Sequence, residues 1–373
     1  MLKFFKDLFR IIILIVLLAA IFISVLTIAE FKPDAVERAP IQGASLGKKV
    51  PAGETFSLIS WNIGYGALGK ECDFVMDGGK GHNADEALVE KYVSGISATL
   101  KANDASVYML QEVDVDSKRS FNTDEREGLY LGQGVHALNY SCLYVPFPWP
   151  PLGKVNSGIF TTTEYEIESA ERISLPCPFS WPLRIANLKR CLLVSRLPVE
   201  GSSKELVLVN LHLEAYDDGD GKIAQTNQLV DFIRSEFSKG NYVIAGGDFN
   251  QTFPGTLNIY PNTHAENWEP GTFENSSIPA GWTFAFDNTT PSCRLLNQPY
   301  DPADTAGTQY YVIDGFIVSP NVQIDDVKTL DEGFVNSDHN PVKLSVTLLP
   351  ENGIAAEPAA PAEPEIVADG ITV

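Results

Sequence analysis

The chain has 373 residues, 44% of them hydrophobic, which is enough for one large domain with a packed core and short appendages. It carries 27 basic against 48 acidic residues, so its formal net charge is −21. Strong nucleic-acid binders usually present a basic surface, because contacts with backbone phosphates supply most of their affinity. The charge therefore argues against a stable nucleic-acid complex. It leaves open a weakly binding nuclease that acts through a metal ion.

The first feature along the chain is an apolar run at the N-terminus. Residues 11–29 are nineteen residues without a charge, and three basic residues precede them. A helix of this length spans about 28 Å, close to the hydrocarbon thickness of a bilayer. The basic flank predicts residues 1–10 in the cytoplasm and one pass through the cell membrane, with the domain on the extracytoplasmic side. A cleaved signal peptide is the alternative, but the run is long for one and Thr27–Ala29 is a weak cleavage site.

Two further segments flank the expected domain, which we place at residues 54–349. Residues 30–53 contain several prolines and glycines, which predicts a linker that lifts the domain off the bilayer. Residues 350–373 are rich in Ala and Pro, with five acidic residues and no basic one. This acidic Ala/Pro tail cannot bury a core, so we expect it to be disordered.

Within the domain, two segments have apolar residues at helical spacing and several have strand character. The helical spacing occurs at residues 84–101 and 223–238 and predicts helices that cover the outside of a sheet. Short strands are predicted at 143–145, 157–162, 192–195 and 205–212. Residues 253–310 show little periodicity, and so long a loop is usually functional. Strands mixed with a few helices predict an α/β fold, a two-sheet sandwich with helices on the outer faces.

The most informative segment is Tyr242–Asn250, which reads YVIAGGDFN. An apolar run typical of a buried strand ends at two glycines and is followed by Asp248 and Asn250. Side chains two residues apart on a strand point the same way. A carboxylate beside an amide can contact both a hard cation and a phosphate. Asp-x-Asn is also common in turns, so this pair alone is weak support for a site.

Other apolar runs also carry polar residues at or near their ends. These residues are Asn62, Glu112, Asn210 with His212, and Asp314, and Ser337–His339 precede a last strand at 342–348. Unpaired polar groups are costly inside a protein, so strands have no structural need for them there. Several strands that each deliver one acid, amide or imidazole predict a metal and acid/base site at one edge of the sheets.

The order and residue patterns of these segments resemble those of the endonuclease/exonuclease/phosphatase superfamily. Its members include pancreatic-type deoxyribonucleases, apurinic endonucleases, neutral sphingomyelinases and inositol-phosphate 5-phosphatases. The matching segments, in the family's order, are SWNIGYG, LQEVDVDSKRS, VNSGIFT, LVNLHLEA, IAGGDFN, IDGFIVS and SDHNPV. They cover about residues 55–348. The resemblance implies the same two-sheet sandwich and a metal-dependent phosphoesterase domain. Gly315 departs from the pattern, because many relatives carry an aromatic residue there.

The acids and amides of this pattern suggest a site for Mg²⁺ or Mn²⁺. Glu112 is the first expected ligand, because these ions prefer hard oxygen atoms. The family layout places Asn62 on the neighbouring strand, where it would assist at the same ion. Asp338 is a further candidate ligand.

The histidines and the remaining acids suggest the catalytic roles. We expect His339 to act as the general base, since a histidine near its ordinary pKa can take a proton from water. Asp314 would orient His339 through the other ring nitrogen. His212 would stabilise the phosphoryl oxygens or the leaving group. Asp248 would align the attacking water or protonate the leaving oxygen, and Asn250 would hydrogen-bond the phosphate.

Four further residues are candidates for substrate binding. These are Asn210, Lys118, Arg119 and Arg294, and for each of the three basic residues a solvated surface role is equally good. Two Pro-rich apolar patches, at residues 147–151 and 178–182, suit either contact with a membrane or ordinary loop packing.

Three functions fit these observations. The favoured one is a membrane-tethered, divalent-metal-dependent phosphodiesterase or phosphatase that acts on lipid headgroups or small phosphoesters. The second is an extracellular nuclease on the same scaffold, which would need a basic groove. The third is a non-catalytic surface binding protein, which would not need the set of acids and histidines described above.

Overall fold

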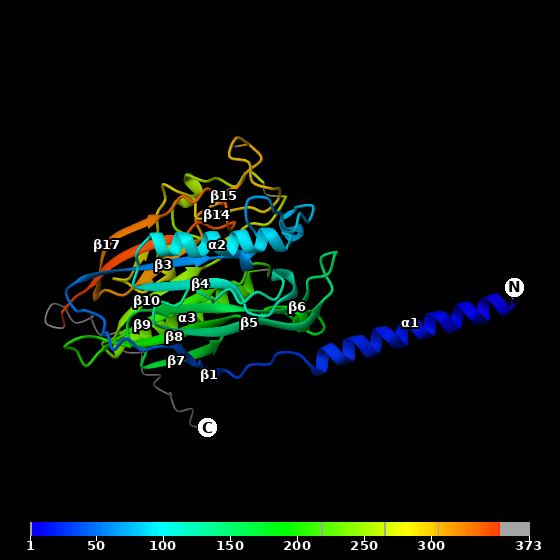
Figure 1. The fold of residues 1–373 in the computed structure, drawn as a ribbon, viewed down its shortest axis with the longest axis horizontal. Coiled ribbons are helices and arrows are strands. Elements are labelled where there is room, and N and C mark those ends of the chain that lie inside the picture. Colours follow the sequence, from blue (N-terminus) through cyan, green and yellow to red (C-terminus); the bar gives the residue numbers. More distant parts are fainter. Residues whose placement is uncertain (1, 218, 265, 305, 351–373) are drawn as a thin grey trace, which may run out of the picture.

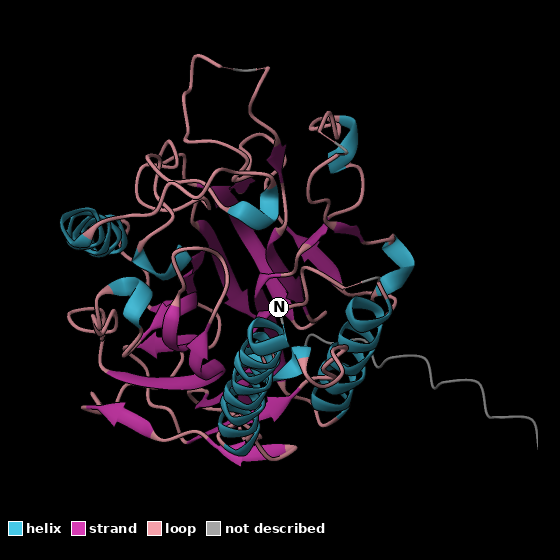
Figure 2. Ribbon diagram, turned by 90° about the vertical axis from the view of Figure 1, so that its right-hand side faces the viewer, coloured by secondary structure: helices cyan, strands magenta, loops and turns pink. Residues whose placement is uncertain are grey.

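The fold is taken from a computed structural model that describes residues 2–217, 219–264, 266–304 and 306–350. Two seven-stranded sheets pack face to face, with α2 and α3 on the outer faces (Figure 1). Figure 2, seen from the side of the N-terminal helix, shows α2 and α3 on opposite sides of the sheets. The two-sheet α/β sandwich predicted from the sequence is therefore confirmed. The predicted tail lies outside the described residues from 351 onward.

The elements have the following bounds. The helices are α1 (Leu2–Ile28), α2 (Glu86–Ala102) and α3 (Asp220–Ser238). The first sheet has the order β1 (Val36–Arg38), β7 (Ser169–Ser174), β8 (Cys191–Pro198), β9 (Glu205–His212), β10 (Tyr242–Asp248), β16 (Asp314–Val318) and β13 (Thr283–Ala285). The second has the order β17 (Val322–Thr329), β18 (Val342–Leu348), β3 (Thr55–Asn62), β4 (Val107–Asp114), β6 (Gly153–Thr163), β5 (Gln133–Val145) and β2 (Ile41–Gly43). Two short pairs lie outside them, β11 (Gln251–Thr252) with β12 (Gly271–Thr272) and β14 (Cys293–Arg294) with β15 (Tyr310–Tyr311).

The core is built by the two-residue alternation of the strands. On β3, Leu58 packs into the cluster between the sheets, whereas Ile59 packs on the other side, in the cluster that includes Ile96 of α2. On β10, Ile244 likewise faces the other sheet, and Val243 faces the layer that contains α3. Both faces of the central strands are therefore buried, which explains why they read as continuous apolar runs.

The two predicted helices form close to their expected positions. α2 starts after Asp85, whose carboxylate accepts a hydrogen bond from the backbone nitrogen of Leu88 and caps the helix. Its buried residues recur every three to four positions: Val89, Tyr92, Ile96 and Leu100. α3 starts at Asp220, three residues before the predicted start. Leu229 and Ile233 turn its apolar face to the first sheet.

The predicted linker at residues 30–53 is wrong in part, because much of it is built into the domain. β1 pairs with β7 at the edge of the first sheet, and β2 pairs with β5 at the edge of the second. Val50 is fully buried in the core between the sheets and bridges Val199. Prolines and glycines interrupt these strands without preventing them, since edge strands tolerate both.

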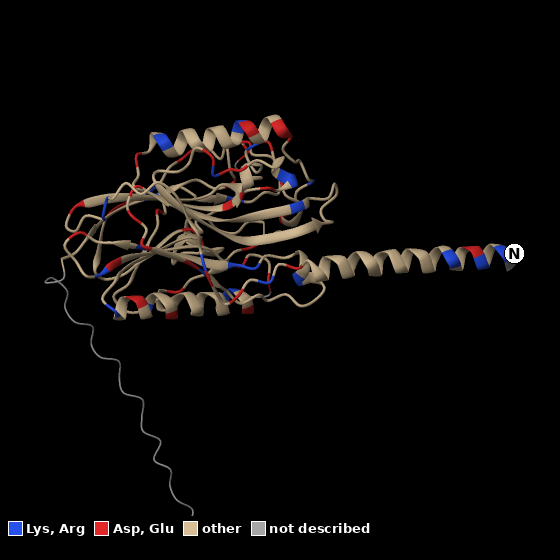
Figure 3. Ribbon diagram, turned by 60° about the horizontal axis from the view of Figure 1, so that its bottom comes forward, with Lys and Arg blue, Asp and Glu red and all other residues tan. Residues whose placement is uncertain are grey.

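α1 is the one helix within the described residues that is long and apolar enough to span a membrane. Figure 3 shows charged residues at its N-terminal end and none along the rest of its length, as the sequence predicts. The helix emerges from one end of the sandwich, and that end also carries the turn between β5 and β6 (Figure 1). Length and composition identify α1 as a candidate membrane anchor, and a signal sequence would share these properties.

Candidate active site

Three candidate residues lie in one row across the first sheet. β9 and β10 are parallel with His212 beside Asp248, and β10 and β16 are antiparallel with Asp248 beside Asp314. Neighbouring strands lie about 4.8 Å apart, so the pairing places three polar side chains next to each other. Gly247 makes this possible, because its φ is +149° and a Cβ there would lie 1.9 Å from the carbonyl oxygen of Leu211.

Asn62 joins this row to the second sheet. Its amide nitrogen donates to Asp248 Oδ2 at 3.0 Å and to Glu112 Oε1 at 3.2 Å. Its amide oxygen accepts from the backbone nitrogen of Gly64. Asn62 therefore presents its N–H groups to the two carboxylates, rather than the oxygen that a role as metal ligand would require. It holds the acids of the two sheets in contact.

Glu112 has a backbone conformation that few side chains adopt. Its φ is +53°, and the pairing of β4 with β6 shifts register between Leu110 and Val113. Such a conformation costs about 1–3 kcal/mol and persists only where the surroundings impose it. The bulge turns the Glu112 carboxylate toward Asn62. Strain at this residue is typical of a functional position.

The third component is the loop of Ser337–His339. Ser337 Oγ donates to the carbonyl oxygen of Asn62 at 2.8 Å, and Trp61 Nε1 donates to that of His339 at 2.8 Å. These bonds fix the loop on the end of β3. His339 Nδ1 then lies 2.8 Å from Asp314 Oδ2. Its Nε2 lies 3.8 Å from the nearest oxygens of both Asp248 and Asp338, so the second ring nitrogen faces the acids.

Three acids of the cluster, Asp338, Asp248 and Glu112, hold their protons more tightly than free carboxylates do. Burial raises the pKa of Asp338 to about 7 and, with the charge of Asp314, raises the pKa of Asp248 to about 6. Burial also raises the pKa of Glu112, which Arg119 and Asn62 partly oppose. These groups crowd negative charge into a space with little water.

The two histidines respond in opposite directions. Burial disfavours the charged ring of His339, but the nearby Asp314 outweighs it and raises the pKa of this histidine well above its ordinary value. Burial lowers the pKa of His212 well below its ordinary value, and the positive charge of Arg190 adds to the effect. His212 is therefore neutral, with Nε2 3.5 Å from Asp248 Oδ2. The site therefore pairs a histidine that holds its proton tightly, His339, with a neutral one, His212.

The donor set fits a hard divalent cation. Glu112 and Asp338, whose charges interact, offer carboxylate oxygens, which Mg²⁺ and Mn²⁺ prefer. Asp314 Oδ1 is buried and has no hydrogen-bond partner among the described residues. Burial raises the pKa values of Asp248 and Asp338, and a bound cation would favour their charged forms. Asp248, Asp314 and His339 also bring ligand atoms within 4.8 Å of one another, but the His339–Asp314 hydrogen bond assigns that group to proton transfer.

Two of the predicted substrate-binding residues are placed elsewhere. Asn210 is fully buried, and its amide nitrogen donates to the carbonyl oxygens of Leu110 and Phe160 in the opposite sheet. Arg294 is 1% exposed and donates to backbone carbonyl oxygens, including those of Gly69 and Cys72. Both predictions are corrected: these side chains tie segments of the core together and do not reach a substrate.

The other predicted substrate-binding residues differ in whether their side chains already have partners within the protein. Arg119 makes two hydrogen bonds to Asp114 and lies 3.5 Å from the ring centre of Tyr65, so its guanidinium is already engaged. Lys118 is exposed, and its role stays a prediction. The amide nitrogen of Asn250 donates to the carbonyl oxygen of Leu213 at 2.8 Å.

The structure adds residues that the sequence reasoning missed. Ser292 Oγ donates to Asp314 Oδ2 at 2.8 Å and so helps to fix the acid that holds His339. It comes from the long loop predicted to be functional, but nothing in its sequence singled it out. Arg190 donates to the carbonyl oxygen of His212 and to Glu214, both within 3.2 Å. Glu214 lies inside the LVNLHLEA segment, so it could have been identified from the resemblance of that segment to the family.

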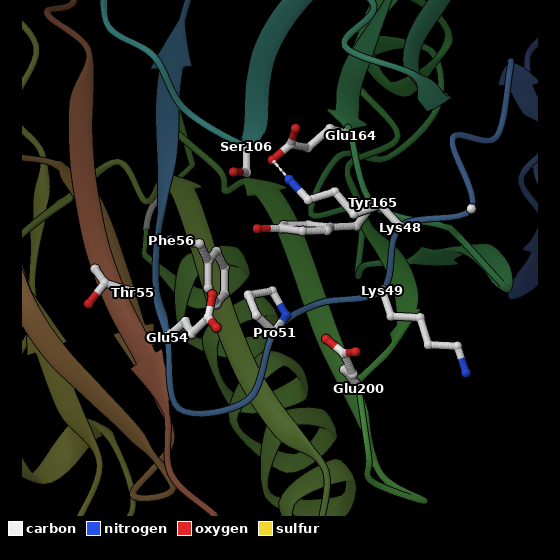
Figure 4. Close-up of a pocket in the computed structure, with 11 residues that line it drawn as sticks. Lys48, Lys49, Pro51, Glu54, Thr55, Phe56, Ser106, Glu164, Tyr165 and Glu200 are labelled. Carbon is white, nitrogen blue, oxygen red and sulfur yellow. Dashed lines mark hydrogen bonds and ion pairs between the residues drawn. The ribbon is translucent and has the colours of Figure 1, made fainter.

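A large open cavity lies away from this cluster. It has a volume of about 590 Å³ and is lined by residues that include Lys48, Glu54, Glu164 and Tyr165 (Figure 4). It also contacts Thr55, the first residue of β3, whereas Asn62 is the last. The cavity is therefore at the opposite end of the sandwich. Its one dashed contact joins Lys48 to Glu164, an ordinary ion pair, so we place the active site at the histidines instead.

Comparison with known proteins identifies the family. The model of the endonuclease/exonuclease/phosphatase family matches residues 59–339, which includes both ends of the cluster just described. The chain belongs to the endonuclease/exonuclease/phosphatase family. Family enzymes are typically phosphoester hydrolases and generally use divalent metals. The search of curated proteins finds no match.

Solved structures of the family share the fold at low sequence identity. An endonuclease/exonuclease/phosphatase from Beutenbergia cavernae matches with a TM-score of 0.51 and 15% identity, over 79% of this chain and 72% of that one. A family protein from Bacteroides vulgatus gives 0.50 and 16%, over 79% and 99%. ANGEL2, a 2′,3′-cyclic phosphatase in complex with adenosine-2′,3′-vanadate, gives 0.51 and 14%, over 84% and 99%. At these identities the matches establish the fold alone.

Proposed function

We propose that this family member is a membrane-tethered, divalent-metal-dependent phosphoester hydrolase. Its substrate would be a lipid headgroup or a small phosphoester on the extracytoplasmic side of the cell membrane. One observation carries the proposal: His339 is held by Asp314 at Nδ1, and its Nε2 faces the acids Asp248 and Asp338. An oriented imidazole beside hard oxygen ligands is what activation of water at a phosphoester requires.

The chain's own residues divide the work as follows. Because Asp314 occupies Nδ1, the neutral ring of His339 would take the proton of the attacking water at Nε2, once the positive charge of a bound cation lowers the raised pKa of this histidine. Asp248 lies within 4 Å of both histidines and can hold that water or return a proton to the leaving oxygen. The neutral His212 can donate a hydrogen bond to a phosphoryl oxygen. Glu112 and Asp338 would hold the cation, which when bound supplies the charge that polarises the phosphoryl group.

The intact cluster argues against a binding protein without catalytic activity. Three buried acids, two buried histidines and the half-buried Glu112 are costly to keep together, and a binding surface does not need them. The strained backbone of Glu112 adds to that cost. The net charge of −21 and the engagement of Arg119 and Arg294 argue against a nucleic-acid substrate.

A substrate screen of the full-length protein tests the proposal. The protein would be assayed with Mg²⁺ or Mn²⁺ against DNA, RNA, sphingomyelin, other phospholipids and inositol phosphates, with His339→Ala as the control for contaminating activity. We expect hydrolysis of a lipid or small phosphoester that EDTA abolishes. Preference for DNA would favour the nuclease, and activity that persists in EDTA would contradict the metal requirement.

A further inference from the structure

One end of the domain carries a group of exposed apolar side chains, which we call the apolar rim. It consists of Leu143, Tyr144, Phe147 and Trp149 at the turn between β5 and β6, with Trp181 and Leu183 at the start of the short helix Leu183–Ala186. Trp149 is 85% exposed, which is unusual for so large an apolar side chain. A cluster of this kind on a soluble surface marks a place of contact.

The apolar rim lies directly against α1. The rings of Phe22 and Tyr144 are in edge contact with centroids 5.8 Å apart, and Trp181 Nε1 donates to Thr27 Oγ1 at 3.2 Å. Phe22 lies seven residues before the end of the charge-free run at Ala29. At 1.5 Å per residue this is about 10 Å along the helix axis. The rim therefore stands beside the segment that would be inside the bilayer.

The connection between α1 and the domain is short and fixed. The side chain of Glu30 is 1% exposed and forms ion pairs with Arg184 at 3.0 Å and with Lys189 at 3.6 Å. Six residues later the chain enters β1 and pairs with β7. The helix and the domain are thus joined by contacts on both sides of residue 30, so the position of α1 in a membrane also sets the position of the rim.

The active site opens at the same end of the sandwich. Asp114, two residues after Glu112, pairs with Ser157 on β6. β5 and β6 continue past this point until Val145 pairs with Gly153. Four residues of strand add about 13 Å, so the tip of the hairpin projects beyond Glu112 in the direction in which β4 ends. The hairpin that carries four of the six rim residues and the acids of the site therefore point the same way.

We propose that the apolar rim inserts into the extracytoplasmic interface of the membrane that α1 spans, and thereby holds the active site against the lipid surface. The occupant is a phospholipid bilayer, because the rim continues the apolar surface of α1 and carries two tryptophans and a tyrosine, the residues that favour this interface. The substrate is then a phosphoester in a headgroup of the same membrane. This second statement rests on the proposed hydrolase activity, whereas insertion of the rim rests only on the proposed anchoring of α1 in the membrane.

Tryptophan fluorescence tests insertion without any enzymatic assay. None of the five tryptophans lies in α1, so quenching by a lipid reports on the domain alone. The full-length protein would be placed in phosphatidylcholine vesicles with or without brominated acyl chains. We expect brominated lipid to quench the wild type, and Trp149→Phe and Trp181→Phe each to remove part of the quenched signal. Equal quenching in the wild type and both variants, or none in the wild type, would overturn insertion.

A second measurement tests what insertion does. Phe147, Trp149 and Leu183 would be changed together to Ser, with Leu46→Ser as the matched control. Leu46 is 59% exposed but packs near Gly132, just before β5 begins and far from the rim. Turnover would be followed on sphingomyelin or another phospholipid in the same vesicle, and on bis(p-nitrophenyl) phosphate in solution, which needs no membrane contact.

The outcomes separate the two proposals. We expect the triple variant to lose about tenfold or more on the vesicle lipid and to keep its rate on the soluble diester, with Leu46→Ser unchanged on both. Equal losses on both substrates would show a structural role and overturn the rim as a docking surface. A wild type that cleaves only the soluble diester would overturn the lipid substrate. A wild type that cleaves neither would overturn the proposed function, while quenching would still decide insertion.

Discussion

The charged side chains at the two ends of the sandwich differ in burial and in hydrogen bonding. At one end, Lys48 and Glu164 form an exposed ion pair beside a cavity of about 590 Å³, and each has solvent on one side. At the other, His339, Asp314 and Asp248 are buried and share hydrogen bonds across two sheets and a loop. The cavity is thus at the end with the simpler chemistry. The active site is therefore distinguished by buried charged groups that hydrogen-bond to one another, and not by the volume of a cavity.

The largest effect should follow removal of the base. His339→Ala should lower turnover by about 10²–10⁴ or more, because general acid/base assistance is worth that much. Asp314→Asn should cost less, since the ring remains but can be held in the wrong tautomer. The double variant should be little worse than His339→Ala, as residues that act as one unit are not additive. His264→Ala, on a surface loop, is the control, and multiplicative losses in the double variant would show separate roles.

Loss of a metal ligand should come next. Glu112→Gln keeps the shape of the side chain but removes a charged oxygen, so metal affinity should fall at least about 10–100-fold, the cost of losing even an outer-shell partner. Metal titrations of activity and calorimetric binding of Mn²⁺ would measure it, and circular dichroism would check the fold. Glu164→Gln, at the opposite end, is the matched control. Unchanged Mn²⁺ binding in Glu112→Gln would remove this residue from the site.

A stability effect without a catalytic effect is expected at Asn210. Asn210→Ala leaves polar groups of the opposite sheet without partners and should lower the free energy of unfolding by about 1–3 kcal/mol. Turnover per folded molecule should not change, because the side chain does not reach the site. Urea unfolding followed by fluorescence gives the first quantity, with the exposed Asn258→Ala for comparison. Loss of turnover in the fully folded variant would restore Asn210 as a substrate-binding residue.

The smallest effect should occur at the far end. A double-mutant cycle of Lys48→Ala and Glu164→Ala should give a coupling free energy in unfolding of about 1 kcal/mol or less, as for other exposed ion pairs. Activity should be unaffected in all three variants. A clear loss of activity would mean that the cavity takes part in function, and the contrast between the two ends would fail.

The sequence predicted which residues belong to the site better than how deeply each one lies between the sheets. Asn210 and His212 are two apart on β9 and share a face, so alternation alone treats them alike. The structure places His212 at the strand end beside Asp248, and Asn210 about 6.6 Å deeper between the sheets. Depth depends on which strands pack opposite, and this information lies in contacts that are distant in sequence. Arg294 was misjudged for the same reason.

Composition misled the prediction of the linker. Prolines and glycines are typical of a spacer, but β1 and β2 have only three residues each and leave no periodic signal. Their partners come much later in the chain: Val36 of β1 pairs with Ile173 of β7, and Ile41 of β2 pairs with Val135 of β5. The helices, by contrast, were predicted closely because the burial pattern of α2 repeats along its own sequence.

The pairing of β1 and β2 has a consequence for any soluble form of the protein. Proteolysis between α1 and β1 would release a domain with both sheets complete, since each short strand would remain at its edge. Cleavage after β2 would instead remove both strands and leave β7 and β5 as bare edges, with unpaired backbone groups open to other chains. A shed fragment that starts near residue 35 should stay dispersed, whereas one that starts near residue 54 should self-associate.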